Sequence, residues 1–337
     1  MSTIVTRTLN GGLLVLVLML WPAVVPAAAQ EAKAGPGPGQ IPAELAIRTT
    51  VPHSGYALAF GFGSLWMISE GRLVRVNPAD DSTTEIDIPT GDGAGLLIDL
   101  DRWRSIAVGE GAVWLPDVAG SVVHKVDPAT DHVVTSVATD IFGSRGSIGV
   151  GEGSLWVVTF DERDRVLTRY DAASGAQQAA IPLPAAGVGV LVAEGAVWVT
   201  AASQAALYRI DPGSNQVVGT TVLHAPAHVL AAGEGAIWVP FDTEGLVQRV
   251  DTATGEVVAT IATGARDMES DGDVTFGGGH VWTITRNSMV ARIDPASNTV
   301  TGVFVPPTGT LMGRRIRWGA GSLWVSGSSI FRIDPPG

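Results

Sequence analysis

The sequence predicts an all-β fold, a seven-bladed β-propeller with four antiparallel strands in each blade. A segment that typically reads Gly-x-Gly, two residues and Trp recurs seven times, with tryptophans 40–48 residues apart: Trp66, Trp114, Trp156, Trp198, Trp238, Trp282 and Trp324. Each copy contains four short β-rich pieces separated by turn residues. A period of about 40–45 residues with four strands per repeat is typical of propeller blades.

The second copy shows how one repeat becomes a blade. We expect four strands in it, over Ser105–Val108, Ala112–Leu115, Ser121–Val126 and His132–Ala138. The tight turn 109–111 uses glycine, which adopts positive φ at little cost, and Pro116–Gly120 reads as a polar loop. The turn after the third strand begins with a residue whose side chain caps backbone N–H groups. In the seven copies this residue is Asn77, Asp127, Asp171, Asp211, Asp251, Asp294 and Asp334.

The repeated tryptophans and the Arg before Ile/Val-Asp are expected to be structural. Each Trp should pack between neighbouring blades, where it buries a large apolar area. The seventh copy ends without a fourth strand, and residues 44–50 resemble the missing piece in length and pattern. We therefore expect residues 44–50 to complete the blade of Trp324 and close the ring, which removes free sheet edges.

The N-terminus reads as a targeting segment. Arg7, the apolar stretch 11–21 and the small-residue run ending at Ala29 fit a signal peptide over 1–29. Residues 30–42 are rich in Pro and Gly and read as a linker, which leaves 43–337 for the propeller. We expect an exported protein, periplasmic or extracellular.

Composition limits the partners. The net charge of −12 becomes −13 when 1–29, with Arg7 as its only charged residue, is removed. An acidic surface is a poor match for nucleic acid or for anionic lipid, so neither is expected as a partner, and we expect a monomer. The chain has no cysteine, which excludes thiolate chemistry and thiolate metal sites.

Function is expected in the variable loops at one mouth of the channel. Counting five residues back from each turn between the first two strands reaches one equivalent position per blade: Tyr56, Arg104, Gly146, Val188, His228, Gly272 and Arg314. Arginine offers a fixed fork of donors for carboxylates and other anions. These positions therefore predict a site for a small anionic ligand, or for a partner protein, at the mouth.

Other loop residues extend this predicted site. Positions next to the mouth add Arg102, Trp103, Arg145, His224, Arg315 and Arg317. Loops between the second and third strands add Glu70, Asp117, Asp161, Glu162, Asp242, Glu244 and Arg286.

No metal site is predicted from the residues alone. The loop 266–273 has Asp267, Glu269 and Asp271 at the spacing that begins a calcium loop, but Gly278 stands where the final acidic ligand belongs. A solvated acidic loop is the preferred interpretation. His224 and His228 would lie about 13 Å apart in an extended strand, too far to share a zinc ion. No Gly-x-Ser-x-Gly motif appears.

The copies GEGAVWLPD…VVHKVDPATDHVV and GEGAIWVPF…VQRVDTATGEVVATI resemble the YVTN-type and virginiamycin-B-lyase-like seven-bladed propellers over residues 43–337. The lyase branch implies ring opening of a cyclic streptogramin ester by elimination, with Mg²⁺ and a catalytic histidine. Its members typically show Trp-Phe-Thr-Glu after the turn and Pro-His-x-Ile in two successive blades. Here only blade five has a comparable histidine, in the segment 226–230 (PAHVL); blade six has Gly272 and blade seven Arg314.

Two functions follow from these observations. The first is a non-catalytic binding propeller without a cofactor, whose mouth is built around Tyr56, Arg104, His228 and Arg314. The alternative is an Mg²⁺-dependent lyase with His228 as the general base and Glu70 or Asp242 helping to hold the ion.

Overall fold

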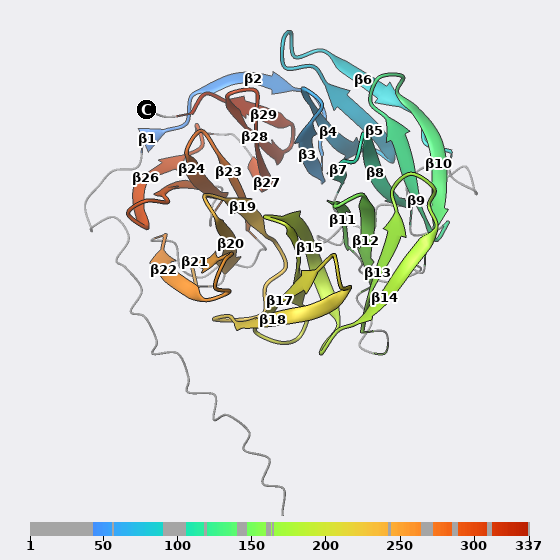
Figure 1. Ribbon diagram of the computed structural model, residues 1–337. Coiled ribbons are helices and arrows are strands. Elements are labelled where there is room, and N and C mark those ends of the chain that lie inside the picture. The colour runs from blue at the N-terminus through green and yellow to red at the C-terminus, as the bar shows by residue number, and fades with distance from the viewer. Residues whose placement is uncertain are drawn as a thin grey trace, which may run out of the picture. The chain divides into compact units, whose positions relative to one another are not determined.

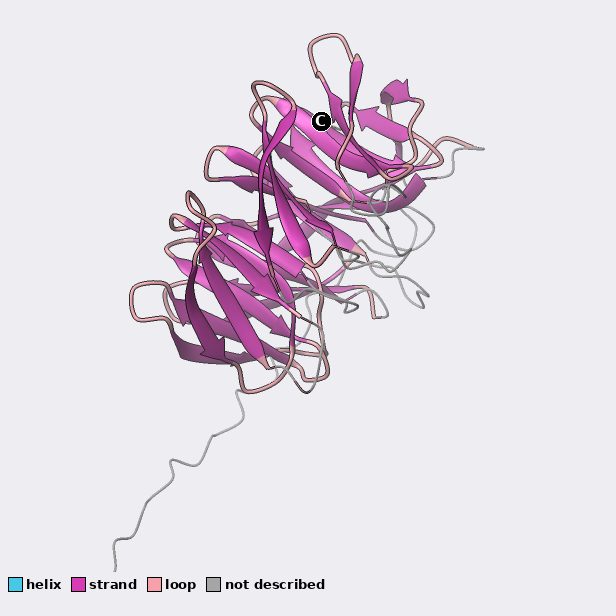
Figure 2. Cartoon of the chain, turned by 90° about the vertical axis from the view of Figure 1, so that its right-hand side faces the viewer, coloured by secondary structure: helices cyan, strands magenta, loops and turns pink. Residues whose placement is uncertain are grey.

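The computed structural model describes residues 43–55, 57–89, 106–117, 120–139, 147–159, 163, 165–241, 244–263, 272–284, 289–308 and 312–335, with only the backbone of Met312 and Arg314. These residues form seven sheets arranged in a ring around a common axis (Figure 1). Every regular element among them is a β-strand (Figure 2). The predicted seven-bladed propeller is therefore confirmed.

The chain divides into two units, Met1–Glu31 and Ala32–Gly337. The predicted signal peptide and linker, residues 1–42, lie outside the described residues, so both stay predictions. Within the described ranges, no helix is long and apolar enough to span a bilayer.

Each blade is built from consecutive strands that run from the channel outward. Blade one contains β3 (Leu58–Gly61), β4 (Ser64–Ser69), β5 (Arg72–Val76) and β6 (Thr83–Ile86). Blade two contains β7 (Ala107–Gly109), β8 (Ala112–Asp117), β9 (Val122–Asp127) and β10 (His132–Ala138). Blade three contains β11 (Ser147–Gly151), β12 (Ser154–Val158), β13 (Val166–Asp171) and β14 (Gln177–Pro182). Blade four contains β15 (Gly187–Ala193), β16 (Ala196–Ala201), β17 (Ala206–Asp211) and β18 (Gln216–Val222).

The remaining blades follow the same order. Blade five contains β19 (Ala231–Gly233), β20 (Ala236–Phe241), β21 (Leu246–Asp251) and β22 (Val257–Ala262). Blade six contains β23 (Asp273–Gly277), β24 (His280–Ile284), β25 (Val290–Asp294) and β26 (Thr299–Val305). Blade seven contains β27 (Met312–Gly319), β28 (Ser322–Gly327) and β29 (Ile330–Ile333).

The N-terminal segment completes blade seven, as the sequence predicts. Strand β2 (Ile47–Val51) pairs antiparallel with β29, with Val51 opposite Ile330, so the first described residues close the ring (Figure 1). The expected strand 44–50 is displaced, because β1 (Ala43–Glu44) pairs instead in parallel with β26 of blade six. Leu45 lies between the two strands, buried in the core that blades six and seven share. The segment therefore ties two blades together.

The second blade corrects one predicted boundary. Strand β8 extends through Pro116 to Asp117, where a polar loop was expected. Pro116 pairs with Val123 of β9, while the described part of β7 pairs no further along β8 than Trp114. Proline is tolerated in a strand where its missing N–H has no neighbouring strand to reach.

The seven tryptophans lie in the core, as expected. Each is at most 1% exposed and lies in the second strand of its blade. Each indole N–H donates to the carbonyl oxygen of the residue five positions earlier, at distances of 3.0–3.2 Å. These acceptors are Gly61, Gly109, Gly151, Ala193, Gly233, Gly277 and Gly319. The repeated Trp thus fills the blade and fixes the turn beside it.

The repeated cation of the third strand links neighbouring blades. In every blade the charged group of this side chain lies 4.7–5.9 Å from the centroid of the Trp ring of the same blade. The seven cations are Arg75, Lys125, Arg169, Arg209, Arg249, Arg292 and Arg332. Arg169 also donates to the Pro212 carbonyl oxygen of the next blade, at 2.5 Å. Arg332 makes the equivalent contact to Pro78 and pairs with Asp81, both at 2.6 Å, which joins blade seven to blade one. The expected structural role of this cation is confirmed.

The first glycine of the turn motif permits close contact between inner strands. A Cβ atom on Gly61, Gly233 or Gly319 would lie 2.0–2.3 Å from a side chain of the next blade. Those side chains are Val108, Phe276 and Phe60, respectively. The fourth copy has Ala193 instead of glycine, and the next blade carries the small Ala232 at the facing position. The small side chain of Ala232 in blade five thus leaves room for the Cβ atom of Ala193 in blade four.

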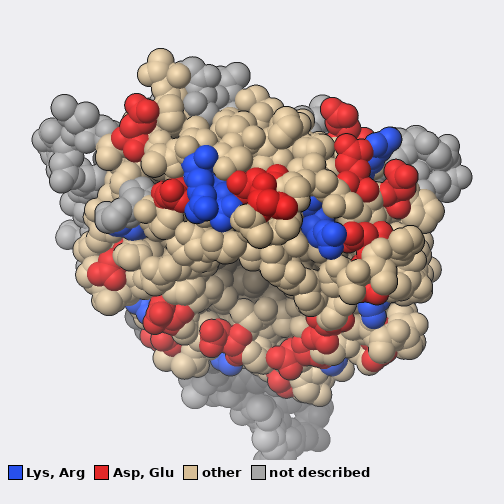
Figure 3. All heavy atoms as spheres, turned by 90° about the horizontal axis from the view of Figure 1, so that it is seen from above, with Lys and Arg blue, Asp and Glu red and all other residues tan. Residues whose placement is uncertain are grey.

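Charged side chains of both signs are mixed on the rim of the ring. On the face in Figure 3, the basic groups are few and lie beside acidic ones. Arg48 pairs with Asp334 at 3.6 Å, and Arg72 pairs with Glu85. This face shows no continuous basic area of the kind that binds phosphate backbones.

Candidate functional site

The inner strands of all seven blades enclose a cavity of about 370 Å³ in the central channel. Most of the residues that line it have apolar side chains, among them Val108, Val150, Leu191, Val229 and Phe276. Its polar side chains are Ser147, His228, Thr275, Arg315 and Arg317. The volume lies within the range of small-molecule sites, which are mostly apolar with a few placed polar groups.

A buried ion pair connects this cavity to blade six. Asp273 is 0% exposed, and its Oδ2 atom accepts hydrogen bonds from Arg317 Nη1 at 2.5 Å and from the Ile316 amide at 3.1 Å. Its Oδ1 atom accepts from the Val274 amide at 2.9 Å. The carboxylate is therefore fully bonded, as a buried charge must be. The pair holds the Arg317 side chain in one orientation.

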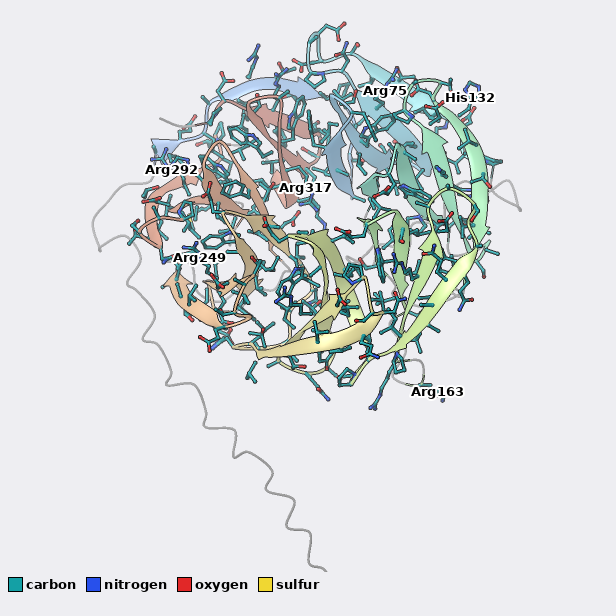
Figure 4. All side chains as sticks on the ribbon, viewed as in Figure 1. Arg75, His132, Arg163, Arg249, Arg292 and Arg317 are labelled. Atoms are coloured by element: carbon teal, nitrogen blue, oxygen red, sulfur yellow. The ribbon has the colours of Figure 1, made fainter. Side chains whose placement is uncertain are left out.

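Arg317 retains donors for a ligand. Its Nη1 group donates to Asp273 and to the Ile316 carbonyl oxygen, at 2.5 and 2.6 Å. Its Nε and Nη2 groups make no hydrogen bond within the part of the chain that the structure describes. The side chain is 25% exposed and points into the channel (Figure 4). A guanidinium with one edge bonded presents its other edge as a preoriented pair of donors.

The structure describes only some of the predicted mouth residues. His228 lines the cavity, just before β19. Tyr56, Arg104 and Asp242 lie outside the described residues. Arg314 lies in β27, and its side chain is not among those described. Glu70 is exposed in the turn between β4 and β5 and is not one of the residues that line the cavity. The ligand-binding and catalytic roles assigned to these five residues and to His228 stay predictions.

Two other predicted loop residues have protein partners. His224 Nε2 lies 3.1 Å from Glu244 Oε2, and its ring packs edge-on against Phe241. Asp117 was expected in the loop between the second and third strands, as part of the mouth site, but is 2% exposed at the end of β8. It belongs to the core of blade two because that strand is longer than predicted.

The donor sets for metals were tested on the described residues. Among them, no three His, Asp or Glu side chains come together closely enough to hold a metal ion. Most of the predicted acidic loop 266–273, namely residues 266–271, lies outside the described ranges, as does Asp242. The Mg²⁺ and Ca²⁺ hypotheses therefore stay untested. Asp273, which was expected at the end of that loop, belongs instead to the inner strand β23.

Blade two contains a second cluster of titratable groups. His124 is 3% exposed; its Nδ1 atom lies 2.8 Å from Ser136 Oγ, and its Nε2 atom lies 3.6 Å from Asp117 Oδ2. Burial lowers the pKa of His124 below that of a free imidazole, and the Asp117 carboxylate opposes this effect only in part. Removal from water disfavours the charged ring, so the neutral form is favoured in the folded state.

This pKa shift predicts a loss of stability in mild acid. Because the folded pKa of His124 lies below the unfolded value of about 6.5, the unfolded state takes up the proton first. The free energy of unfolding should therefore fall as the pH drops below about 6.5, and this contribution should level off below the folded pKa. Urea unfolding between pH 7.5 and 5 would measure it. His124→Gln should flatten the dependence, whereas the exposed His132→Gln should retain it; equal slopes in parent and His124→Gln would contradict the assignment.

Sequence reasoning assigned Arg317 and Asp273 to loops, although a signal for the inner strand was present. The residue two positions before each turn is small or uncharged in six blades: Ala59, Ala107, Gly149, Leu191, Ala231 and Thr275. Arg317 is the only charged side chain in this set. A residue-by-residue alignment of the seven inner strands would have placed it in the wall of the channel.

Comparison with solved structures relates the fold to known lyases. The chain superposes on a streptogramin B lyase with a TM-score of 0.68 and 17% identity, covering 84% of this chain and 94% of that one. A virginiamycin B lyase from Staphylococcus aureus gives 0.68 and 14%, covering 86% and 98%. A catalytically inactive histidine-to-alanine form of that enzyme with quinupristin gives 0.68 and 15%, covering 87% and 99%.

The propeller arrangement is also found outside the lyases. The WD40 β-propeller domain of Doa1 matches with a TM-score of 0.62 and 13% identity, covering 85% of this chain and 95% of that one. No protein-family model matches the sequence, and no curated protein sequence matches it. What the comparisons establish is the fold: this chain is a seven-bladed propeller like the virginiamycin B and streptogramin B lyases.

Proposed function

We propose that the chain is an exported, non-catalytic propeller that binds a small anionic ligand in its central channel. The observation that carries the proposal is the cavity of about 370 Å³, whose lining includes His228, Arg315 and Arg317 among mostly apolar side chains. A cation beside apolar walls attracts an anion more strongly than one in open water, because the local dielectric constant is low. The mature chain is acidic, so this attraction is local to the channel.

The test is a binding screen with anions of different chemistry. Thermal shift followed by calorimetry would use inorganic phosphate, acetate, hexanoate and benzoate as probes. Replacing Arg317 with Gln should lower the affinity for any anion that binds. The expected loss is at least tenfold, because the preoriented donors are lost. Arg72→Gln is the matched control, since Arg72 is an exposed arginine paired with Glu85 outside the channel.

The outcomes of the screen separate the possibilities. Binding that weakens in Arg317→Gln and falls with rising salt supports the channel, because ion pairs that are partly exposed are screened. The predicted mouth residues Arg104 and Arg314 can be replaced together by Ala in the same assay. Absence of binding by every probe, or equal binding by parent and Arg317→Gln, would refute the channel as an anion site.

The lyase remains the second candidate, because the fold matches streptogramin and virginiamycin B lyases and His228 lines the channel. Quinupristin would be incubated with the protein and MgCl₂, and its cyclic and linear forms would be separated by chromatography. Ring opening that is lost in His228→Ala would support the lyase. Unchanged quinupristin at high enzyme concentration would reject it.

A further inference from the structure

We infer that the channel ligand is a monocarboxylate with a compact apolar body, bound through the Nε–Nη2 edge of Arg317. The inference rests on the proposed function, and it specifies the chemical class that this cavity would select. Three features carry it: the orientation of Arg317, the apolar wall and the buried carboxylate of Asp273.

The orientation of Arg317 favours a planar anion with two oxygens. Asp273 and the Ile316 carbonyl oxygen occupy Nη1, which fixes the plane of the guanidinium. The Nε–H and one Nη2–H then point the same way and match the two oxygens of a carboxylate. A site that is held in place before binding loses less side-chain entropy when the ligand arrives.

The wall of the cavity favours an apolar body. Blades two to six contribute partly exposed aliphatic or aromatic side chains: Val108, Val150, Val190, Leu191, Val192, Val229, Leu230 and Phe276. A small hydrophilic anion leaves these side chains in contact with water. An aliphatic or aromatic group replaces that water, and each methylene buried contributes about fourfold in affinity.

The buried carboxylate of Asp273 reduces the positive charge that Arg317 presents to a ligand. Asp273 is 0% exposed and shares the Arg317 guanidinium with any ligand bound to its free edge. Repulsion between like charges is strong beside a low-dielectric wall. The free edge of Arg317 offers two parallel donors, so phosphate, which has more oxygens than a carboxylate, is a poorer match to it.

The inference is tested by calorimetry of the full mature chain at pH 8, above the ordinary titration range of imidazole. The probes are acetate, butanoate, hexanoate, hexanamide, adipate and inorganic phosphate. Affinity should rise about fourfold per methylene from acetate to hexanoate, until the cavity is filled. Adipate and phosphate should bind at least tenfold more weakly than hexanoate, and the neutral hexanamide should show no binding.

Two variants separate charge from geometry. Arg317→Lys keeps the positive charge but removes the planar pair of donors, so hexanoate should bind at least tenfold more weakly. Arg72→Gln should bind hexanoate as the parent does. The ligand series needs no variant, so it remains decisive even where a substitution at Arg317 lowers folding yield.

The results distinguish this inference from the function on which it rests. If acetate, adipate or phosphate binds as tightly as hexanoate, or Arg317→Lys binds hexanoate as the parent does, the assignment to apolar monocarboxylates is wrong and the anion site stands. If none of the charged probes binds, both fail. Ordered affinities in the parent with loss in Arg317→Lys would support the assignment.

Discussion

Replacing Trp198 with Ala should lower the free energy of unfolding by about 3–5 kcal/mol. Trp198 is fully buried in the core between blades four and five, among Leu207, Leu223 and Ile237. Truncation removes this packing and leaves a cavity that the rigid blades can fill only in part. It also removes the indole N–H group that donates a hydrogen bond to the Ala193 carbonyl oxygen. Equilibrium unfolding in urea, followed by tryptophan fluorescence and circular dichroism, measures the loss.

The matched variant is Trp198→Phe. It retains an aromatic ring in the core but loses the N–H group, so it should be destabilised less, by about 1–2 kcal/mol. A loss below about 1 kcal/mol in Trp198→Ala would mean that the indole contributes little to the blade interface. Coincident transitions from the two probes are needed, because a free energy of unfolding is defined only for a cooperative transition.

The fold could be predicted from sequence because the same turn and capping residues recur in each blade. The turn Gly109-Glu110-Gly111 recurs with two positive φ angles, of 51° and 73°, as the tight hairpin turn requires. The Asp171 carboxylate accepts from the amides of Ala173 and Ser174, as the expected cap does. Signals of this kind depend on residues close in sequence, so seven copies reinforce one another.

The parts that differed depend on how each strand pairs with its neighbours in the fold. Strand β1 pairs in parallel with β26, some 260 residues later. No local sequence pattern predicts a parallel pairing of only two residues. Strand β8 continues through Pro116 because β9 still pairs with it there while the described part of β7 does not. Tertiary context of this kind overrides local turn and strand propensity.

The candidate site was predicted only in part, for a reason visible in blade seven. A count of five residues back from the turn assumes seven inner strands of equal register. It selects His228, which lines the cavity, and Arg314, whose side chain is not among those described. Strand β27 has an irregular register between Met312 and Ile316, and β15 has one between Gly187 and Gly189, so a fixed count does not reach the same structural position in every blade. Among the described side chains, the arginines that line the cavity are Arg315 and Arg317, which the count did not select.

A chain that lacks residues 30–51 should lose most of its stability or fail to remain soluble. The deletion removes β1 and β2, and with them Leu45 and Val51, which are 2% and 1% exposed. Burying two such aliphatic side chains contributes about 3–6 kcal/mol, a large share of the stability of a typical domain. Blade seven is left with three strands, and the edge of β29 is exposed to pairing with other chains. Melting temperature and light scattering measure the two effects.

The control is a chain that lacks only residues 30–42. It keeps both strands, so its melting temperature and monomeric state should match those of the chain that begins at Gln30. The contact from Arg332 to Pro78 and Asp81 remains in both deletions and still joins blade seven to blade one. The comparison therefore isolates the contribution of β1 and β2 from that of the arginine link. If the chain without residues 30–51 melts at the temperature of the control and stays monomeric, the Arg332 link suffices and the N-terminal strands contribute little to ring closure.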